Sequence, residues 1–501
     1  GFSGVLGVLP RHTPPLPSMG DLSAQVAALS AKLDAAREDE EMFMRDATAS
    51  WLVLCGACVF FMQTGFAMIE TGVVSKLNVV SVMFKNLLDS CIAGLTFWLV
   101  GFAFAYGDDA NGFIGTTKFG LADVGAGAES LGKWFFQWTF AGASATIVSG
   151  AVCERIRIRS YIVFTTAMSS LIYPLVAHWM WGGGFLSGRT RDDGSVDALF
   201  GSYGALDFAG SGVVHLVGGV AALTGAIFLK PRIGRFHPET GEPKELEGHN
   251  KTLMVLGTGV LAFGWYGFNC GSVGSIQHNG AVISRVAANT TVALSSGGFA
   301  GILISMFCCD GRFELQIVLN CLLAGLVSVT AGADFLQQWA VFIVASVGAL
   351  VYFGARTLIL KLRIDDPLEA SAVHGAVGAW GLIAAGMFCT DSEVHPVFIP
   401  GKPAVVPGTA CASGVQFGTQ VVAMLCIVAW TGVTSTLVWG SLRLAGILRV
   451  PFEWEEIGMD NLEHGADAFP SRDPQLGFML EAGGQDHGAQ LWVDDKYLQG
   501  G

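Results

Sequence analysis

Charged residues are scarce in this chain. Only 14% of its 501 residues are Asp, Glu, Lys or Arg, against roughly 25% in a typical soluble domain. The sequence also lacks the alternating segments of about ten residues from which transmembrane β-barrels are built. Its apolar stretches are continuous runs of about 20 residues, the length with which an α-helix crosses a bilayer. With 52% hydrophobic residues, the chain is predicted to be an all-α polytopic membrane protein.

Several functional signatures are missing as well. The sequence has no cofactor motif, so we predict neither an enzyme nor a bound cofactor. The net charge of −13 lies mostly in the two tails and gives no reason to expect a nucleic-acid partner. The first residues do not show the basic and apolar regions of a signal peptide, and we expect the first spanning helix to direct insertion. Cys55 and Cys58 have the spacing of a redox motif, but inside an apolar run they are interpreted as packing residues.

Residues 1–47 precede the first apolar run and are expected to form an extracellular extension. Residues 1–20 are rich in Gly and Pro and are predicted to be disordered, whereas 21–46 are predicted to be helical. Apolar residues of this helix follow a 4-3-4 spacing over about two heptads. They are Leu22, Val26, Leu29 and Leu33. A small helical bundle above an oligomer and a frayed amphipathic helix both remain open.

Eleven spanning helices are predicted from the apolar runs, in a membrane domain over 48–446. The runs are 51–72, 87–106, 132–153, 160–184, 205–229, 252–272, 281–307, 314–331, 337–360, 369–388 and 415–445. Lys and Arg concentrate in the loops after the odd-numbered spans. These residues are Lys76, Lys85, Arg155, Arg157, Arg159, Lys230, Arg232, Arg235, Lys244, Lys251, Arg312, Lys361 and Arg363. Because cytoplasmic loops carry the excess of basic residues, the N-terminus is predicted outside and the tail, 447–501, in the cytoplasm.

The odd number of spans divides into five plus five plus one. Spans one to five and six to ten would then have opposite topology, an inverted repeat that places a transport path at the repeat interface. The fifth and tenth spans each carry a histidine, His215 and His374, and an ionisable residue inside an apolar helix marks a substrate path by default. His374 lies only about one helical turn from the start of its run. For the two to meet, span ten must begin inside the membrane, buried in protein.

Two interpretations apply to His215 and His374. They are either unrelated core histidines, each hydrogen-bonded to a backbone carbonyl, or a functional pair. Their matching positions in the two halves favour the pair. In an apolar interior both would stay largely neutral, and as neighbours they would share at most one proton. Such a pair can accept, donate or relay a proton. A metal site is not predicted, because no Cys, Asp or Glu lies close in sequence to complete the ligands.

Acidic and amide residues near the helix ends also have alternative roles. Asp207 at the start of span five is either an N-cap, satisfying free N–H groups, or an attractor for a cation at the entrance. Both roles are compatible. Glu70, Asn78 and Asp89, near the first two spans, are interpreted as ties between helices.

Aromatic residues are spaced to share helix faces. Phe136 and Phe140 lie four residues apart on span three, and Phe268 and Ser272 lie four apart on span six. Trp181 is near the outer end of span four, where Trp is normally a membrane anchor. A Trp beside a hydroxyl at a pore mouth would instead bind a small cation, with a cation–π attraction of roughly 2 kcal/mol when desolvated.

The chain resembles the family of ammonium transporters, methylammonium permeases and Rhesus proteins. The matching stretches follow the family's order and cover roughly 48–465. They are GFAMIETG (65–72), GAVCER (150–155), WGGG (181–184), DFAGSGVVH (207–215), GWYGFN (264–269), DDP (365–367) and VHG (373–375). Trp181 and Ser272 favour the ammonium transporter branch, and Gly458 and Asp460 match a plant-like tail.

The resemblance implies a role for each candidate residue. Trp181, Phe136 and Ser272 would recruit ammonium or methylammonium, with Asp207 supporting the entrance. Phe140 and Phe268 would form a stacked gate, and His215 and His374 would be the twin pore histidines. The family further implies eleven helices in a lipid bilayer and a homotrimer whose tail touches the neighbouring subunit.

Three positions depart from the family's pattern. Ser211 replaces a glycine before His215, and Trp138 lies between the two phenylalanines, where it could alter the vestibule. Leu462 stands where many plant transporters have a threonine whose phosphorylation closes them, which puts that control in doubt. Residues 1–47 match no part of the family's pattern.

The expected activity is transport of ammonium across the plasma membrane. An intact cation in an apolar lumen would cost several kcal/mol, so ammonium is expected to lose its proton and cross as ammonia. The alternative is an ammonium sensor with little net transport.

Overall fold

Long apolar helices form the framework of the protein, as the sequence predicts. The computed structural model describes residues 18–125, 128–190, 196–392, 410–465 and 468. Within these residues, nine helical segments are long and apolar enough to cross a membrane, and α10 is a shorter apolar helix. Helices lie over all the predicted runs. This architecture is that of an all-α polytopic membrane protein.

The first half of the chain runs from α1 to α7. Its helices are α1 (Met19–Val73), α2 (Val79–Thr96), η1 (Phe97–Gly101), α3 (Phe102–Tyr106), η2 (Phe119–Leu121), α4 (Ala128–Val152), α5 (Ile158–Ala167), η3 (Met168–Ile172), α6 (Tyr173–Trp181), η4 (Leu199–Gly201), η5 (Ser211–Leu216) and α7 (Val217–Leu229). Two antiparallel strand pairs lie in its loops. They are β1 (Asp109–Ala110) with β2 (Ile114–Gly115), and β3 (Arg189–Thr190) with β4 (Val196–Asp197).

Within the described residues, the second half contains helices and no pair of strands. Its helices are α8 (Lys251–Gly271), α9 (Gly280–Cys308), α10 (Leu315–Thr330), α11 (Gln338–Lys361), η6 (Ser371–Ala376), α12 (Val377–Phe388), α13 (Val415–Leu444), α14 (Phe452–Ile457) and α15 (Met459–His464).

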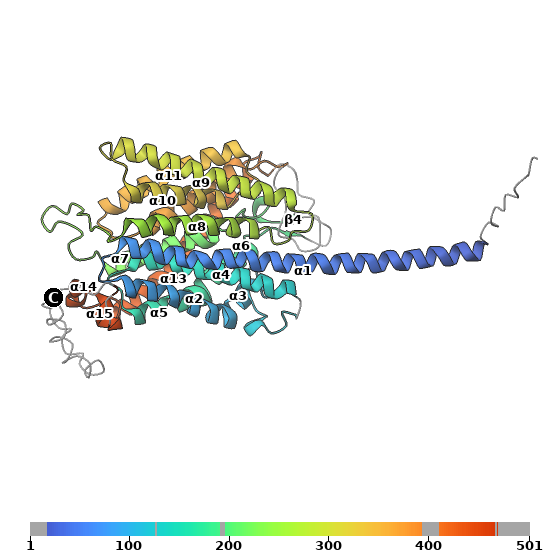
Figure 1. Cartoon of the computed structure of the whole chain (residues 1–501), viewed down its shortest axis with the longest axis horizontal. Helices are drawn as coiled ribbons and strands as arrows, with labels where there is room; N and C mark the ends of the chain where they lie inside the picture. The colour runs from blue at the N-terminus through green and yellow to red at the C-terminus, as the bar shows by residue number, and fades with distance from the viewer. Residues whose placement is uncertain (1–17, 126–127, 191–195, 393–409, 466–467, 469–501) are drawn as a thin grey trace, which may run out of the picture.

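Helix α1 is a single rod that runs through the bundle and far beyond it (Figure 1). Its burial in the bundle begins at Thr48. We call residues 19–47 of α1 the stalk, the end of the bundle from which they project the stalk face, and the opposite end, which carries α14 and α15, the tail face. The sequence predicts the stalk helix and the first span as separate elements. The structure joins them, because no Gly or Pro interrupts the helix between the two.

Two predicted helix starts are wrong. The second span begins at Val79 rather than 87, so Lys85, which was assigned to a loop, is fully buried in α2 with its ammonium 5.8 Å from the Tyr161 ring centroid. The polar residues of this first turn concealed the helix. The fifth span begins at Ser211 rather than 205, because Gly210 turns the chain with a φ of +104°.

Buried polar side chains tie neighbouring helices together, as predicted for three of them. Ser149 of α4 donates to the Glu70 carboxylate over 2.7 Å. Tyr161 of α5 donates to the Asp89 carboxylate of α2 over 2.6 Å. The remaining tie joins Asn78 to Glu154 over 2.9 Å.

A cluster of ion pairs closes the tail face. Arg232 lies 2.8 Å from the Asp365 carboxylate and 2.5 Å from that of Glu154, and Arg235 lies 3.2 Å from Asp365. Burial alone would raise the pKa of Asp365. The guanidinium groups of Arg155 and Arg232 outweigh this and hold that pKa well below its ordinary value. The carboxylate is therefore charged. Together with Arg232, which also binds Glu154, it joins three loops that are far apart in the sequence.

The described part of the tail packs on its own subunit. The Asp460 carboxylate accepts hydrogen bonds from the backbone N–H groups of Val80 and Ser81, at 3.0 and 2.9 Å, and so caps the first turn of α2. Glu455 accepts from the Ile233 N–H over 2.8 Å. These contacts connect α14 and α15 to the loops of the tail face.

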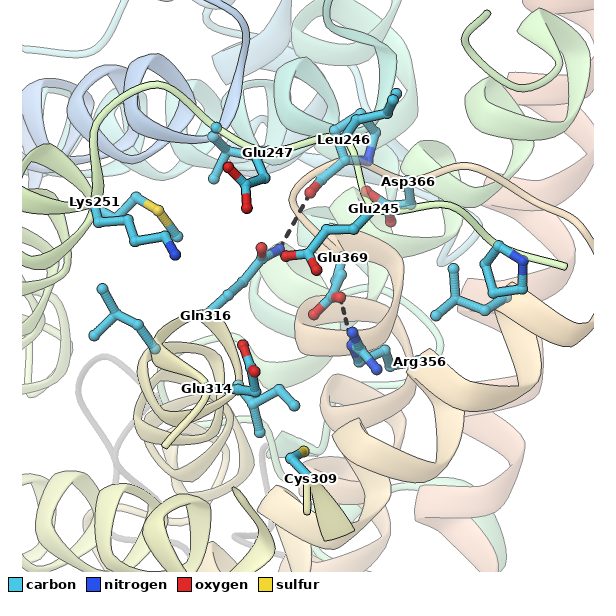
Figure 2. Close-up of a pocket in the computed structure, with 18 of the residues that line it drawn as sticks. Glu245, Leu246, Glu247, Lys251, Cys309, Glu314, Gln316, Arg356, Asp366 and Glu369 are labelled. Atoms are coloured by element: carbon cyan, nitrogen blue, oxygen red, sulfur yellow. Dashed lines mark hydrogen bonds and ion pairs between the residues drawn. The ribbon is translucent and has the colours of Figure 1, made fainter. Parts of the chain in front are cut away.

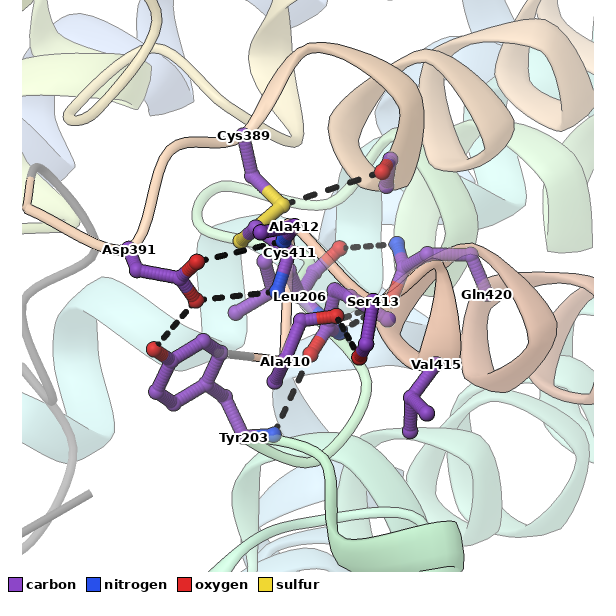
Figure 3. The surroundings of a disulfide bond; sticks show 12 residues. Tyr203, Leu206, Cys389, Asp391, Ala410, Cys411, Ala412, Ser413, Val415 and Gln420 are labelled. Carbon is purple, nitrogen blue, oxygen red and sulfur yellow. Dashed lines mark hydrogen bonds between the residues drawn. A yellow bond between two sulfur atoms is a disulfide. The ribbon is translucent and has the colours of Figure 1, made fainter. Parts of the chain in front are cut away.

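A disulfide on the stalk face joins Cys389 to Cys411, which the sequence analysis did not predict (Figure 3). Asp391 lies beside it and accepts hydrogen bonds from the N–H groups of Cys411 and Ala412, at 2.9 and 3.1 Å. The Tyr203 hydroxyl donates to the same carboxylate over 2.7 Å. The bridge and this carboxylate fasten the connection between α12 and α13. By contrast, Cys55 and Cys58 are free and pack against glycines of α8, as predicted.

The two histidine-bearing helices approach backbone to backbone. A Cβ on Gly219 of α7 would lie 2.0 Å from the backbone nitrogen of Gly375 in η6, so only glycine fits there.

Replacing Arg232 by alanine is expected to destabilise the protein by about 3–5 kcal/mol, because the buried Glu154 loses its ion-pair partner and the buried Asp365 loses one of two. Thermal unfolding of the purified protein in detergent measures the loss. The matched control is Lys361→Ala, at an exposed position. Equal melting temperatures for the two variants would contradict the assigned role of the cluster.

Substitution Gly219→Ala should force α7 and η6 apart and lower the melting temperature. The control is Gly259→Ala in α8, where the new methyl group meets open space. There alanine favours the helix by roughly 0.5–1 kcal/mol. The two substitutions should therefore shift the melting temperature in opposite directions, and a rise for Gly219→Ala would refute the close approach.

Candidate functional site

Trp181 and Asp207 are joined at the stalk face. The indole N–H of Trp181, at the end of α6, donates to the backbone carbonyl of Asp207 over 2.7 Å. Its ring meets Phe140 edge-on with centroids 6.0 Å apart. The half-buried indole is thus held inside the bundle and faces the aromatic residues of α4, which is not how a lipid-facing anchor would lie.

Ser272 ends α8 close to these aromatic residues. Its hydroxyl donates to the Phe268 carbonyl over 2.9 Å, so the hydrogen is engaged and the oxygen lone pairs are left to accept a bond. The Phe136 ring lies 4.7 Å from that of Phe140. A cation with N–H groups would be attracted to these aromatic faces and could donate a hydrogen bond to the hydroxyl oxygen.

Phe140 and Phe268 block the way inward. Their rings are stacked, with centroids 4.0 Å apart and an interplanar angle of 16°. Both side chains are buried. The distance is van der Waals contact, so nothing passes between the rings unless they turn.

Behind this pair lie His215 and His374. Their Nδ1 atoms are 3.1 Å apart and hydrogen-bonded, and the rings are stacked at 16° with centroids 5.2 Å apart. One ring must donate at Nδ1 and the other must accept there. The neutral pair therefore holds one shared proton between the rings, and the structure joins the two histidines that the sequence placed in matching helices.

Trp265 is a member of this site that the sequence analysis missed. Its ring stacks on His215 at 11° with centroids 5.1 Å apart, and its N–H donates to Thr330 over 3.0 Å. Trp265 precedes Phe268 by three residues, so the two share a face of α8. That spacing was a signal available in the sequence.

Each histidine helix begins with a carboxylate cap. His215 follows Asp207 by eight residues, and His374 follows Asp366 by eight residues. The Asp207 carboxylate accepts from the N–H groups of three following residues, at 2.8–3.0 Å, and Asp366 accepts from Ser371 N–H over 2.7 Å. Asp207 belongs to the stalk face and Asp366 to the tail face. Asp207 is thus a cap, one of its two predicted roles.

Both helices open in the π conformation, over η5 and η6. Ser211 secures η5, since its hydroxyl donates to the Val327 carbonyl over 2.6 Å and accepts from Ala331 N–H over 2.8 Å. The departure from glycine therefore adds a tie to the end of α10. Span ten begins inside the bundle, with Ala370 and Ser371 buried, as the meeting of the histidines required.

A small cavity of about 30 Å³ continues from His374 toward the tail face. It exceeds the volume of about 10–15 Å³ that one water needs. Phe66 and Leu261 give it apolar walls, while Glu70 and Asn320 are polar residues at its edge. Glu70 is thus both a helix tie and a lumen neighbour, the second of which the sequence analysis did not foresee.

A pocket of about 410 Å³ opens beyond this cavity at the tail face (Figure 2). The carboxylates of Glu247 and Glu314 point toward its middle, and Glu369 pairs with Arg356 at its wall over 2.5 Å. Asn320, which edges the small cavity, donates to Glu369 over 3.0 Å. This hydrogen bond connects a residue that lines the small cavity to one that lines the larger pocket.

Trp138 lies away from the site. Its ring packs 5.4 Å from Phe60 of α1, so it turns toward α1 rather than into the space between Phe140, Phe268 and the stalk face. Among the residues described by the structure, no group of three His, Cys, Asp or Glu side chains is arranged to hold a metal ion.

Comparisons with known proteins agree with this geometry. The model of the Ammonium Transporter Family matches residues 50–469. Ammonium transporter 1 member 3 of Solanum lycopersicum is 39% identical, covering 84% of this chain and 92% of that protein. Ammonium transporter Amt2 of Archaeoglobus fulgidus is 37% identical, covering 87% and 91%.

Solved structures are similar over the same region. A protein described as Sensor Amt Protein has a TM-score of 0.75 at 30% identity, covering 85% of this chain and all of that one. Mep2 of Candida albicans has a TM-score of 0.70 at 27% identity, covering 81% and 86%. From the extent of these matches, the chain belongs to the ammonium transporter family.

Proposed function

We propose that this protein transports ammonium across the membrane by recruiting the ion, removing its proton and passing ammonia along a pore lined by two histidines. The observation that carries the proposal is the His215–His374 hydrogen bond, 3.1 Å long, in an apolar lumen behind two stacked phenylalanines. Membership of a transporter family supports it.

Recruitment takes place at the stalk face. The faces of Trp181 and Phe136 attract a small cation, and the free lone pairs of Ser272 accept one of its N–H bonds. The Asp207 carboxylate is occupied by hydrogen bonds that it accepts from backbone N–H groups. Its contribution is therefore to hold η5 and the carbonyl that fixes Trp181.

Deprotonation explains how ammonium is separated from potassium, which has similar size and charge. An intact ion that passes the phenylalanines would lose its hydration beside His215, where Trp265 and Phe268 offer no carboxylate to replace it, at a cost of several kcal/mol. Ammonium avoids this cost by leaving its proton behind, and potassium has none to leave. The two imidazoles then pass ammonia by exchanging hydrogen bonds with it, and their shared Nδ1 proton offers a separate path for the released proton.

The stalk face is the extracellular side in this proposal. The disulfide Cys389–Cys411 supports this, because disulfides persist in oxidising compartments. The basic loops then lie in the cytoplasm. Counting α4 and α10 with the nine long apolar segments gives eleven spans, arranged as the inverted repeat of five and five plus one. The membrane is the plasma membrane.

The assembly is a homotrimer, with one pore in each subunit and the tail, 447–501, regulating it. The tail residues beyond 468 lie outside the described residues. Those described reach α2 through Asp460, so movement of the tail would act on the helix that follows α1. Leu462 has no hydroxyl to phosphorylate at the position where plant transporters have a threonine. Regulation of the tail at that position would require another signal.

A second candidate function is an ammonium sensor with little net transport. The likeness to the structure described as Sensor Amt Protein favours it. The sequence of the tail shows no recognisable signalling domain, and transport is therefore the first proposal.

Replacing both His215 and His374 by leucine should abolish the ammonium-driven current, since the shared proton disappears. Electrophysiology on a membrane containing the variant measures the current, and surface expression is the control. A current of undiminished size that still excludes potassium would refute the proton relay.

Expression in a yeast strain without ammonium transporters separates the two functions. A transporter restores growth on low ammonium. An absence of growth with intact surface expression would favour the sensor. The variant Phe136→Ala should weaken growth only at the lowest ammonium concentrations, because it removes part of the recruitment site.

A further inference from the structure

The stalk carries an apolar seam along its whole length. The seam residues are spaced alternately three and four apart, which is the a and d pattern of a coiled coil. They are Met19, Leu22, Val26, Leu29, Leu33, Ala36, Glu40, Phe43 and Ala47. Because α1 is helical from Met19 onward, the pattern extends over about four heptads rather than the two predicted from Leu22 to Leu33.

This seam is uncovered in the single chain. Every residue from 18 to 43 is exposed, and Val26, Leu29 and Phe43 are 68%, 69% and 69% exposed. The stalk also has a defined beginning. Ser18 and Asp21 form a reciprocal capping box, with the Asp21 N–H donating to the Ser18 hydroxyl over 3.2 Å. A capped rod with an apolar seam is a partner surface, because a lone helix of this kind is only marginally stable in water.

We propose that the stalks of neighbouring copies of this chain pack seam to seam, in a parallel and in-register coiled coil above the membrane. A strict 3.5-residue repeat keeps one seam facing its partner only if the helices wind around each other with a left-handed supercoil. At about 1.5 Å per residue the coil would extend about 43 Å from the bundle.

A second copy of this chain, inserted in the same membrane, is the partner that fits the seam. The stalk continues into the bundle without a break (Figure 1), so all copies in one membrane carry the seam at the same height and in the same direction. Identical residues then meet at each level. No sliding or reversal is needed for Leu29 to face Leu29 of the neighbouring copy.

Glu40 is the polar position of the seam. In register it meets the same residue of the neighbours, at a cost in stability that fixes alignment, as single polar a residues do. The flanking charges add no attraction, since Lys32 at g would face Arg37 at e of the next copy. Association therefore depends on the apolar seam and strengthens with salt, which screens these like charges.

The inference is independent of the pore mechanism, and residues 1–47 lie before the family match. It joins subunits through a surface separate from the membrane-embedded helices. In the proposed trimer, three stalks would form one bundle.

Cysteine cross-linking of the full chain in native membranes tests the proposal. Leu29→Cys places a thiol in the seam, and Ala31→Cys places one on the opposite face of the same helix. Mild oxidation should give several-fold more covalent dimer with Leu29→Cys than with Ala31→Cys or the parent chain. Equal dimer from both variants, or none from Leu29→Cys, would overturn the proposal, whatever partner the seam then has.

A second pair of variants guards against a loss of helix. Adding Glu40→Leu to Leu29→Cys should increase the cross-linked fraction, and adding Leu33→Asp should decrease it. Native gel electrophoresis of the same membranes reports the oligomer. An intact oligomer without seam cross-linking refutes the coiled coil alone, whereas loss of the oligomer in the parent chain refutes the proposed trimer.

Discussion

The hydrogen bond between His215 and His374 is the interaction on which the centre of the molecule depends. Two imidazoles can be buried in an apolar interior because the Nδ1 atom of each ring finds its hydrogen-bond partner in the other ring. To bring them within 3.1 Å, α7 and η6 must touch, and Gly219 allows the contact. Each helix must also start inside the bundle, which leaves free N–H groups there. Asp207 and Asp366 satisfy these groups from opposite faces.

Buried polar side chains farther from the histidines also have hydrogen-bond or ion-pair partners. Glu70, Asp89 and Asn78 bind neighbouring helices, and Arg232 binds the loops of the tail face through two carboxylates. These polar ties help to specify which helices are neighbours. Apolar burial cannot do so in lipid, because lipid tails are as apolar as the side chains that face them. The lumen is the exception. There the polar atoms are few, and His215 Nε2 has no partner among the described residues.

Sequence patterns predicted the helices and the pairing of the histidines, because hydropathy and the order of the helices are properties of whole segments. These patterns did not predict features that depend on contacts between individual side chains. Lys85 was assigned to a loop because a buried ammonium beside Tyr161 cannot be inferred from hydropathy. The disulfide Cys389–Cys411 depends on a distance between loops. Trp265 was overlooked although its spacing from Phe268 was visible, since stacking on His215 requires the relative positions of two helices.

The stacked rings of Phe140 and Phe268 also bear on the kinetics of passage. The two ring centroids are 4.0 Å apart, so the rings pack as closely as side chains in a protein core. To separate, both rings and the helices that hold them must move together. Such motion is thermally activated. A molecule that crosses this point would therefore wait for rare openings, and its flux would rise more steeply on warming than diffusion through an open water-filled channel does.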